Sequence, residues 1–167
     1  DDYRHFIIPH EDLKDRFIEA IDVRPGNRNV VHHVIAYVDT SGKARELDAA
    51  DPGPGYTRFG GVGFEAASVL GGWAPGNFPV KTPSGTGRWL PPKCDVVLQV
   101  HYYRTGIEER DRTKIGVYFS KADRPVPVRG TLVINQNFTI EPNVKSYAVT
   151  AEQTIRQDSY MFSVTPH

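Results

Sequence analysis

The chain has a single cysteine in 167 residues, Cys94, so no disulfide can form within it, and cysteine usage leaves its redox compartment open. Twenty basic side chains balance twenty acidic ones, and no block of lysine and arginine interrupts that balance. Nucleic acids and anionic membrane surfaces attract proteins through a basic excess. Neither is therefore an expected partner.

Long apolar runs are missing as well. No stretch approaches the roughly 20 apolar residues that cross a bilayer, so the sequence predicts no membrane span. The opening residues, DDYRHFIIPH, have neither the basic nor the apolar part of a signal peptide. We interpret the sequence as a mature chain or as a piece excised from a longer one. With 39% hydrophobic and 24% charged residues, its composition is that of a folded globular protein.

What the sequence does contain is typical of an all-β protein. Short runs rich in Val, Ile, Tyr, Phe and Thr are separated by Gly, Pro, Asn or Asp. The expected strands are residues 16–23, 29–39, 95–103, 114–119, 130–140, 145–150 and 159–165. Helix-forming composition is confined to residues 10–17 and 43–51, and residues 51–87 are predicted to form a long loop. We predict a jelly-roll-like β-sandwich.

A change of composition marks the expected domain boundary. Prolines cannot donate ladder hydrogen bonds, so strand pairing is expected to stop in KADRPVPVRG, residues 121–130. We assign residues 1–125 to an amino-terminal sandwich and residues 126–167 to the beginning of a second, similar one. The second unit has about three expected strands, which are too few to close a core. It is therefore predicted to be incomplete.

The histidines are the candidate functional residues. Strand alternation places Gln99 and His101 on one face of the run VVLQVHYY. His32 and His33 are neighbours, and neighbours on a regular strand point to opposite faces. The ordinary interpretation is thus one buried histidine and one solvated histidine. Both can reach one metal ion only where the backbone bends or the site lies at a sheet edge.

Imidazole is a ligand for copper, zinc, iron and nickel, and three imidazoles on two strands form an all-nitrogen donor set of the kind that copper accepts in both oxidation states. His5 and His10, near the amino terminus, are expected to be solvated. No Gly-x-Ser-x-Gly elbow and no phosphate-binding loop occurs in the chain, and no catalytic residue is assigned.

Four blocks carry a resemblance to a known family. In order along the chain they are VVHHVIAYVD, GGWAPGNFPVKTPSGTGRWLPP, DVVLQVHYYRTG and MFSVTPH. In order and approximate spacing, they resemble the copper type II, ascorbate-dependent monooxygenases, the family of dopamine β-hydroxylase and peptidylglycine α-hydroxylating monooxygenase. The resemblance covers nearly the whole chain. It implies two jelly-roll domains, each holding one copper, that face each other across a cleft.

The resemblance implies a role for each matching residue. His32, His33 and His101 match the ligands of the electron-transferring copper, and Gln99 matches a glutamine beside that site. His167 matches the first of two histidines that hold the oxygen-binding copper. The second histidine and the ligating methionine of that site are absent, because Met161 comes too early in the pattern and is interpreted as a core side chain.

The family also implies partners and a location. These are O₂, an ascorbate-like reductant, a small-molecule or peptide substrate held by the missing part of the second domain, and a secreted or periplasmic site. Family members tend to have cysteines where His5 and Arg58 stand, so the resemblance implies that a family disulfide is lost. Thr165 stands near the place of a substrate-binding arginine in the peptide-hydroxylating branch, which argues against peptide substrates.

The sequence therefore predicts the electron-transfer copper domain of a monooxygenase that hydroxylates C–H bonds. Two alternatives stay open. One is a stand-alone copper-binding or electron-transfer module without hydroxylase activity, which a reading frame ending at His167 would favour. The other is a metal-free sandwich that binds carbohydrate or protein, which metal analysis would separate from the first two.

Overall fold

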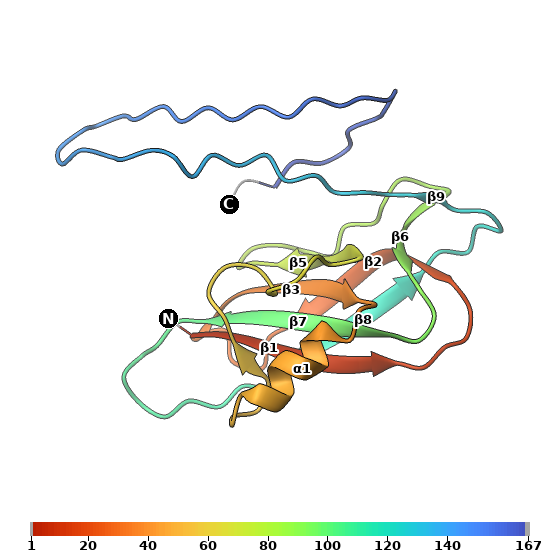
Figure 1. Cartoon of the computed structure of the whole chain (residues 1–167), viewed down its shortest axis with the longest axis horizontal. Helices are drawn as coiled ribbons and strands as arrows, with labels where there is room; N and C mark the ends of the chain where they lie inside the picture. Colours follow the sequence, from red (N-terminus) through yellow and green to blue (C-terminus); the bar gives the residue numbers. More distant parts are fainter. Residues whose placement is uncertain (1, 166–167) are drawn as a thin grey trace. The chain divides into compact units, whose positions relative to one another are not determined.

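The computed structural model of the chain describes residues 2–165 and divides into two compact units, Asp1–Arg129 and Gly130–His167. Figure 1 shows the strands of the first unit and the extended path of the second. The elements are β1 (Asp2–His10), β2 (Arg16–Arg24), β3 (Val31–Asp39), α1 (Lys43–Ala50), β4 (Tyr56–Thr57), β5 (Ser68–Trp73), β6 (Thr86–Leu90), β7 (Cys94–Tyr102), β8 (Lys114–Phe119) and β9 (Val126–Pro127).

The first unit is a sandwich of two sheets. One sheet has the strand order β4-β1-β7-β3-β5, and the other has the order β8-β2-β6-β9. All pairs are antiparallel except β6 with β9. Strands β1, β2 and β3, and again β6, β7 and β8, pass alternately between the two sheets. The predicted all-β sandwich is confirmed.

Strand alternation builds the core between the sheets. On β7, Leu98 and Val100 point inward and are at most 5% exposed, as the spacing of their apolar neighbours predicted. On β3, Val34, Ala36 and Val38 do the same and are fully buried. The other face of the five-stranded sheet points away from this core. It is available to pack against further segments or to carry a binding site.

The outer face of the five-stranded sheet is partly covered by α1 and by the segment that follows it. Ala44 of α1, Tyr56 and Val62 form a second apolar cluster on Val97 of β7. Residues farther along the same face of β7 are polar, namely Gln99 and His101. The candidate site therefore lies beside a small second core.

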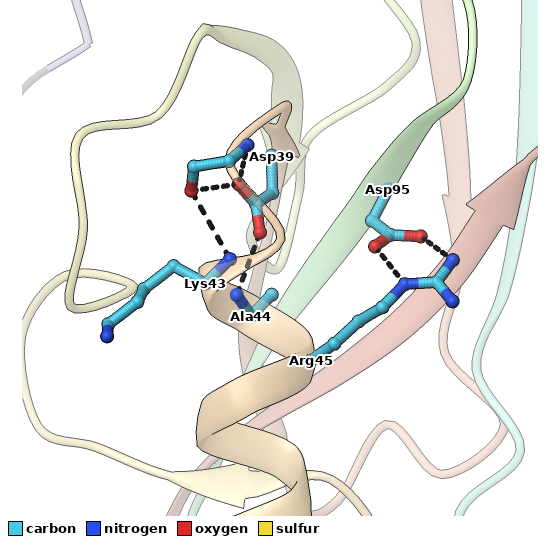
Figure 2. A network of polar contacts seen from close by, with 6 residues as sticks. Asp39, Lys43, Ala44, Arg45 and Asp95 are labelled. Atoms are coloured by element: carbon cyan, nitrogen blue, oxygen red, sulfur yellow. Dashed lines mark hydrogen bonds and ion pairs between the residues drawn. The ribbon is translucent and has the colours of Figure 1, made fainter.

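Polar contacts fasten α1 to this face (Figure 2). The buried carboxylate of Asp39, at the end of β3, accepts hydrogen bonds from the Ser41 backbone at 2.7 Å and from the Ala44 backbone at 2.7 Å. It thereby satisfies an amide of the first helical turn from outside the helix. Arg45 donates to both oxygens of Asp95 at 2.6 and 2.7 Å. These contacts tie the helix to the ends of β3 and β7.

Several elements differ from the sequence-based expectation. Residues 10–17 form no helix, because His10 ends β1, Asp12 closes a turn onto Lys14, and β2 begins at Arg16. The amino terminus forms β1, which the sequence did not predict, and the expected long loop 51–87 contains β5. The helix expected over residues 43–51 is confirmed as α1.

The second unit contradicts the three strands expected in it. Residues 130–165 contain no hydrogen-bonded strand, although the chain runs extended (Figure 1). Two of its runs contact each other through the Phe138 and Tyr147 rings, 6.3 Å apart, and through a hydrogen bond from the Asn135 amide to the Thr150 carbonyl at 2.8 Å. Strand-like composition and a single neighbouring run are not enough for a stable ladder, because two strands without a further layer are marginal in water. Met161, expected in a core, is 83% exposed.

The boundary expected at residues 125 and 126 stays a prediction. Within residues 2–165, no helix combines the length and the apolar character needed to cross a membrane.

Candidate metal centre

His33 and His101 come together because β3 and β7 are adjacent antiparallel strands. The two residues are direct partners in the strand register. Their ring centroids lie 4.9 Å apart, and both residues are buried, at 6% and 7% exposure. His101 is paired with β1 on one side and with β3 on the other, and His33 lies one residue before the pairing of β3 with β5 begins.

His32 joins them through a β-bulge. Val31 pairs with Tyr102 and His33 pairs with His101, so β3 advances two residues where β7 advances one, and His32 is the extra residue. Val31 and Val34 on either side both belong to the core between the sheets. The two histidines between them therefore share the outer face. Two neighbouring histidines can reach one metal ion only where the backbone bends, and the bulge at His32 supplies that bend.

The three rings form one compact donor set. One ligand atom of each histidine can be chosen so that all three lie within 4.8 Å of one another. The Nδ1 atoms of His32 and His33 are 3.2 Å apart and share a hydrogen bond. A metal ion about 2.0 Å from two imidazole nitrogens in tetrahedral geometry separates them by about 3.3 Å. The spacing of this pair already suits a shared ion.

Burial differs among the three ligands. His32 is exposed while His33 and His101 are buried. The expectation of one buried and one solvated neighbour is thus met, although both histidines lie on the same face. A site of this kind is held by the sheet on one side and is open to solvent on the other.

Tyr3 supports the site from β1. It pairs with His101 in the strand register, and their rings are stacked with centroids 4.0 Å apart and planes within 10°. The Tyr3 ring also meets the edge of His33 at 6.2 Å, and Phe59 packs edge-on against Tyr3 at 5.1 Å. Sequence reasoning missed Tyr3 because the amino terminus was not recognised as a strand. The alternation of Tyr3 with His5 was the available signal.

Gln99 lies two residues before His101 on the same face and is 2% exposed. Its amide nitrogen donates to His5 Nε2 at 2.9 Å and to the Gly60 carbonyl at 2.5 Å. The expectation that His5 is solvated is wrong, because His5 is fully buried. Its burial, together with the positive charge of Arg58, lowers the pKa of His5 from 6.5 to about 4, although a hydrogen bond to Tyr56 acts to raise it.

Cys94 does not contribute a soft ligand. It is 4% exposed, lies in the core between the sheets, and pairs with His10 at the opposite end of β7 from His101. Burial, reinforced by the negative charge of Asp95, raises the pKa of its thiol to about 11. The residue is therefore a neutral, inert thiol at neutral pH.

His167 lies outside the described residues. Its expected role as the first ligand of a second copper site stays a prediction. A search of residues 2–165 for three or more His, Cys, Asp or Glu side chains that could hold a metal ion finds the cluster of His32, His33 and His101.

No family model, curated protein or solved structure matches the chain. Its function has to be inferred from the residues of this site.

Asp111 joins the ends of the two strands that carry the ligands. Its carboxylate accepts hydrogen bonds from the Asn27 backbone at 2.9 Å and from the Tyr102 hydroxyl at 3.0 Å, and Thr113 donates to it twice. Asn27 in turn accepts from the backbone of Val31, next to the bulge. Burial acts to raise the pKa of Asp111, but its four hydrogen-bond donors outweigh it, and the pKa lies below the ordinary value.

We predict that Asp111→Ala weakens metal binding without unfolding the chain. Without Asp111, the turn before β3 and the end of β7 keep the backbone hydrogen bond from Tyr103 to Val30 but lose the side-chain contacts that join them, so the three imidazoles are held less firmly at one spacing. The Kd for copper, measured by competition with a chelator, is expected to rise about tenfold, which corresponds to about 1.4 kcal/mol. Glu108→Ala is the matched control, because Glu108 lies on the same loop and is exposed. Equal Kd values for the two variants would contradict this role.

Proposed function

We propose that the chain carries the electron-transfer copper centre of a copper-dependent monooxygenase, which hydroxylates C–H bonds with O₂ and a one-electron reductant such as ascorbate. The observation that carries the proposal is the bulge at His32, which places two neighbouring histidines on the face of His101. A regular strand would separate them. The sequence resemblance to the copper type II monooxygenases agrees with the same three residues.

The donor set suits copper, as imidazole also suits zinc, iron and nickel. Imidazole nitrogen is a good ligand for both Cu(I) and Cu(II), whereas hard ions such as Mg²⁺ and Ca²⁺ prefer oxygen ligands. The three donors are all histidines, and the one thiol of the chain points into the core at the far end of β7. A copper ion bound by this triad supplies one-electron chemistry at neutral pH.

The protein side of the site favours such a role. His33 and His101 are fixed by the central strands of the sheet, and Tyr3 stacks on His101. When the ligands keep their positions, a bound copper ion can change its oxidation state with little rearrangement of the protein. His32 is exposed, so a small reductant can approach within reach of the ligand set from solvent. The centre is thus built to accept and pass an electron.

Substrate chemistry is proposed to belong to the remainder of the second domain, with His167 as its first ligand. The partners are then O₂, an ascorbate-like reductant and a small-molecule or peptide substrate. A secreted or periplasmic location is part of the same proposal.

The proposal is tested by reduction of the copper-loaded chain. Ascorbate is expected to abolish the paramagnetic Cu(II) signal of one copper per chain, and the His101→Ala protein is expected to give no such specific signal. The same chain is expected to yield no hydroxylated product from phenethylamine or a glycine-extended peptide, because it lacks most ligands of the oxygen-binding site. A Cu(II) signal that resists ascorbate would refute the electron-transfer role. Stoichiometric hydroxylated product would refute the half-enzyme assignment instead.

A second candidate is a stand-alone electron-transfer module. The triad of His32, His33 and His101 is compatible with it, because one-electron transfer needs a single metal centre. The polypeptide encoded after His167 distinguishes the two. A histidine two positions later and a ligating methionine farther on favour the monooxygenase.

A further inference from the structure

His5 is a buried histidine that the proposed copper set does not use. It lies on β1, is fully buried, and pairs with Gln99 of β7 on one side and with Tyr56 of β4 on the other. Its ring stacks on the Tyr56 ring with centroids 4.5 Å apart and planes within 8°. A histidine placed in this way has a defined set of partners, and its two ring nitrogens can be assigned.

The partners of His5 determine its tautomer. Nδ1 lies 3.3 Å from the Tyr56 carbonyl, which can only accept, so Nδ1 carries the proton. Nε2 is then a bare acceptor, and it lies 2.9 Å from the amide nitrogen of Gln99. The lowered pKa of His5 agrees with a ring that stays neutral in the folded protein.

This tautomer in turn determines which way the Gln99 amide is turned. Gln99 has two N–H groups, and His5 Nε2 and the Gly60 carbonyl are both acceptors, so each takes one of them. If the amide were reversed, its oxygen would face two other acceptors. The Gln99 side chain therefore has one allowed orientation, two residues from His101 on the same face of the strand.

His5 also fastens the segment that covers this face. Its partner Tyr56 donates through its hydroxyl to the Val62 carbonyl at 2.9 Å, which closes residues 56–62 into a loop. β1 and the start of this loop approach so closely that a side chain at Gly55 would collide with the His5 carbonyl. Phe59 of the loop packs on Tyr3, which stacks on His101. One chain of contacts thus runs from His5 through Tyr56 and the 56–62 loop to Tyr3 and His101. The second link is one of position, because Gln99 lies two residues from His101 on the same face of β7.

We propose that His5 is a positioning residue of the metal centre, which sets the orientation of the Gln99 amide and holds the 56–62 loop against Tyr3. This inference rests on the proposed function, since it assumes that His32, His33 and His101 bind copper. Groups around the ligands that orient them typically change metal affinity by about 10- to 100-fold when they are removed. His5 acts through Gln99 and Tyr56 and does not bind the metal itself.

The test compares His5→Phe with His5→Gln in the copper-loaded chain. Phenylalanine keeps a planar ring against Tyr56 but removes both ring nitrogens, which leaves a buried Gln99 N–H without its acceptor. We expect the copper Kd to rise at least tenfold and the Cu(II) paramagnetic spectrum to change. Glutamine offers an oxygen near the place of Nε2, so its Kd is expected to stay within about threefold of the original value.

A second measurement reads the same contact without copper. In the metal-free protein, the two Gln99 side-chain amide protons are expected to exchange slowly with solvent in the original chain and in His5→Gln, and rapidly in His5→Phe. If His5→Phe does not fold, Gln99→Leu tests the contact from the other side and is expected to raise the copper Kd to a similar extent.

The outcomes separate the two proposals. An original chain that binds no copper refutes the metal centre itself. The positioning role is refuted if the original chain binds copper and His5→Phe has the same Kd and spectrum. Where His5→Phe does not fold, the same result in Gln99→Leu refutes it. Equal losses in His5→Phe and His5→Gln also refute it, because they would show that an acceptor for the Gln99 amide does not restore copper binding.

Discussion

Copper at a thousand times its Kd is expected to raise the free energy of unfolding of the chain by about 4 kcal/mol, and His101→Ala is expected to abolish this increase. The triad exists only when β3 and β7 are paired, so copper binds the folded chain far more tightly than the unfolded one. His101 is the one ligand on β7, and its loss leaves two neighbouring histidines on a single strand. Chemical denaturation with and without copper measures the effect.

His10→Ala is the matched control for this prediction. His10 is also a histidine of the five-stranded sheet, but it pairs with Cys94 at the end of β7 opposite to His101. The full copper-dependent increase is expected to remain in His10→Ala. Identical unfolding curves with and without copper in the original chain, or an increase that survives His101→Ala, would show that the triad does not hold the ion.

Acid is expected to destabilise the metal-free chain more than the His5→Gln variant, by roughly 2 kcal/mol at pH 4.5 relative to pH 7. The pKa of His5 is lowered from 6.5 to about 4 in the folded protein, chiefly by burial. Below pH 6.5 the unfolded chain therefore takes up a proton that the folded chain refuses. The contribution of neutral His5 to stability is complete above pH 6.5 and is lost as the pH falls toward 4.

The comparison between the two proteins isolates His5 from other titrating groups. Glutamine does not titrate, and the triad histidines and the carboxylates are the same in both chains. The charged group that acts on His5 is Arg58, and Tyr56 is its hydrogen-bond partner, and both are retained. Urea denaturation at pH 7 and at pH 4.5 gives the four free energies. Parallel losses in the two proteins would mean that His5 is protonated in the folded state.

Local patterns predicted the strands that carry the ligands. The faces assigned on β7 are confirmed, with Leu98 and Val100 in the core and Gln99 and His101 on the other side. Alternation of apolar and polar residues can be recognised within one strand. It predicts the faces correctly here because one face of the sheet is buried. The same logic fails at the amino terminus, because the burial pattern of β1 alternates less regularly than that of β7.

Pairing decided what alternation could not. The expected strands in residues 130–165 have suitable composition and two of these runs contact each other, but the described residues form no ladder of backbone hydrogen bonds. His5 was expected in solvent and is fully buried, because β4 and β7 flank it on both sides. Neither partner is near it in the sequence, so no local signal reports their presence.

The sequence alone determined that the chain is an all-β protein and that three histidines lie on two of its strands. Only the tertiary structure decided that these histidines share one face, because the register between β3 and β7 creates the bulge at His32. A bulge forms where one strand has an extra residue, relative to its partner, between two consecutive residue pairs. It therefore depends on the count of residues in both strands. That count is a property of the pair of strands, and a single strand does not carry it.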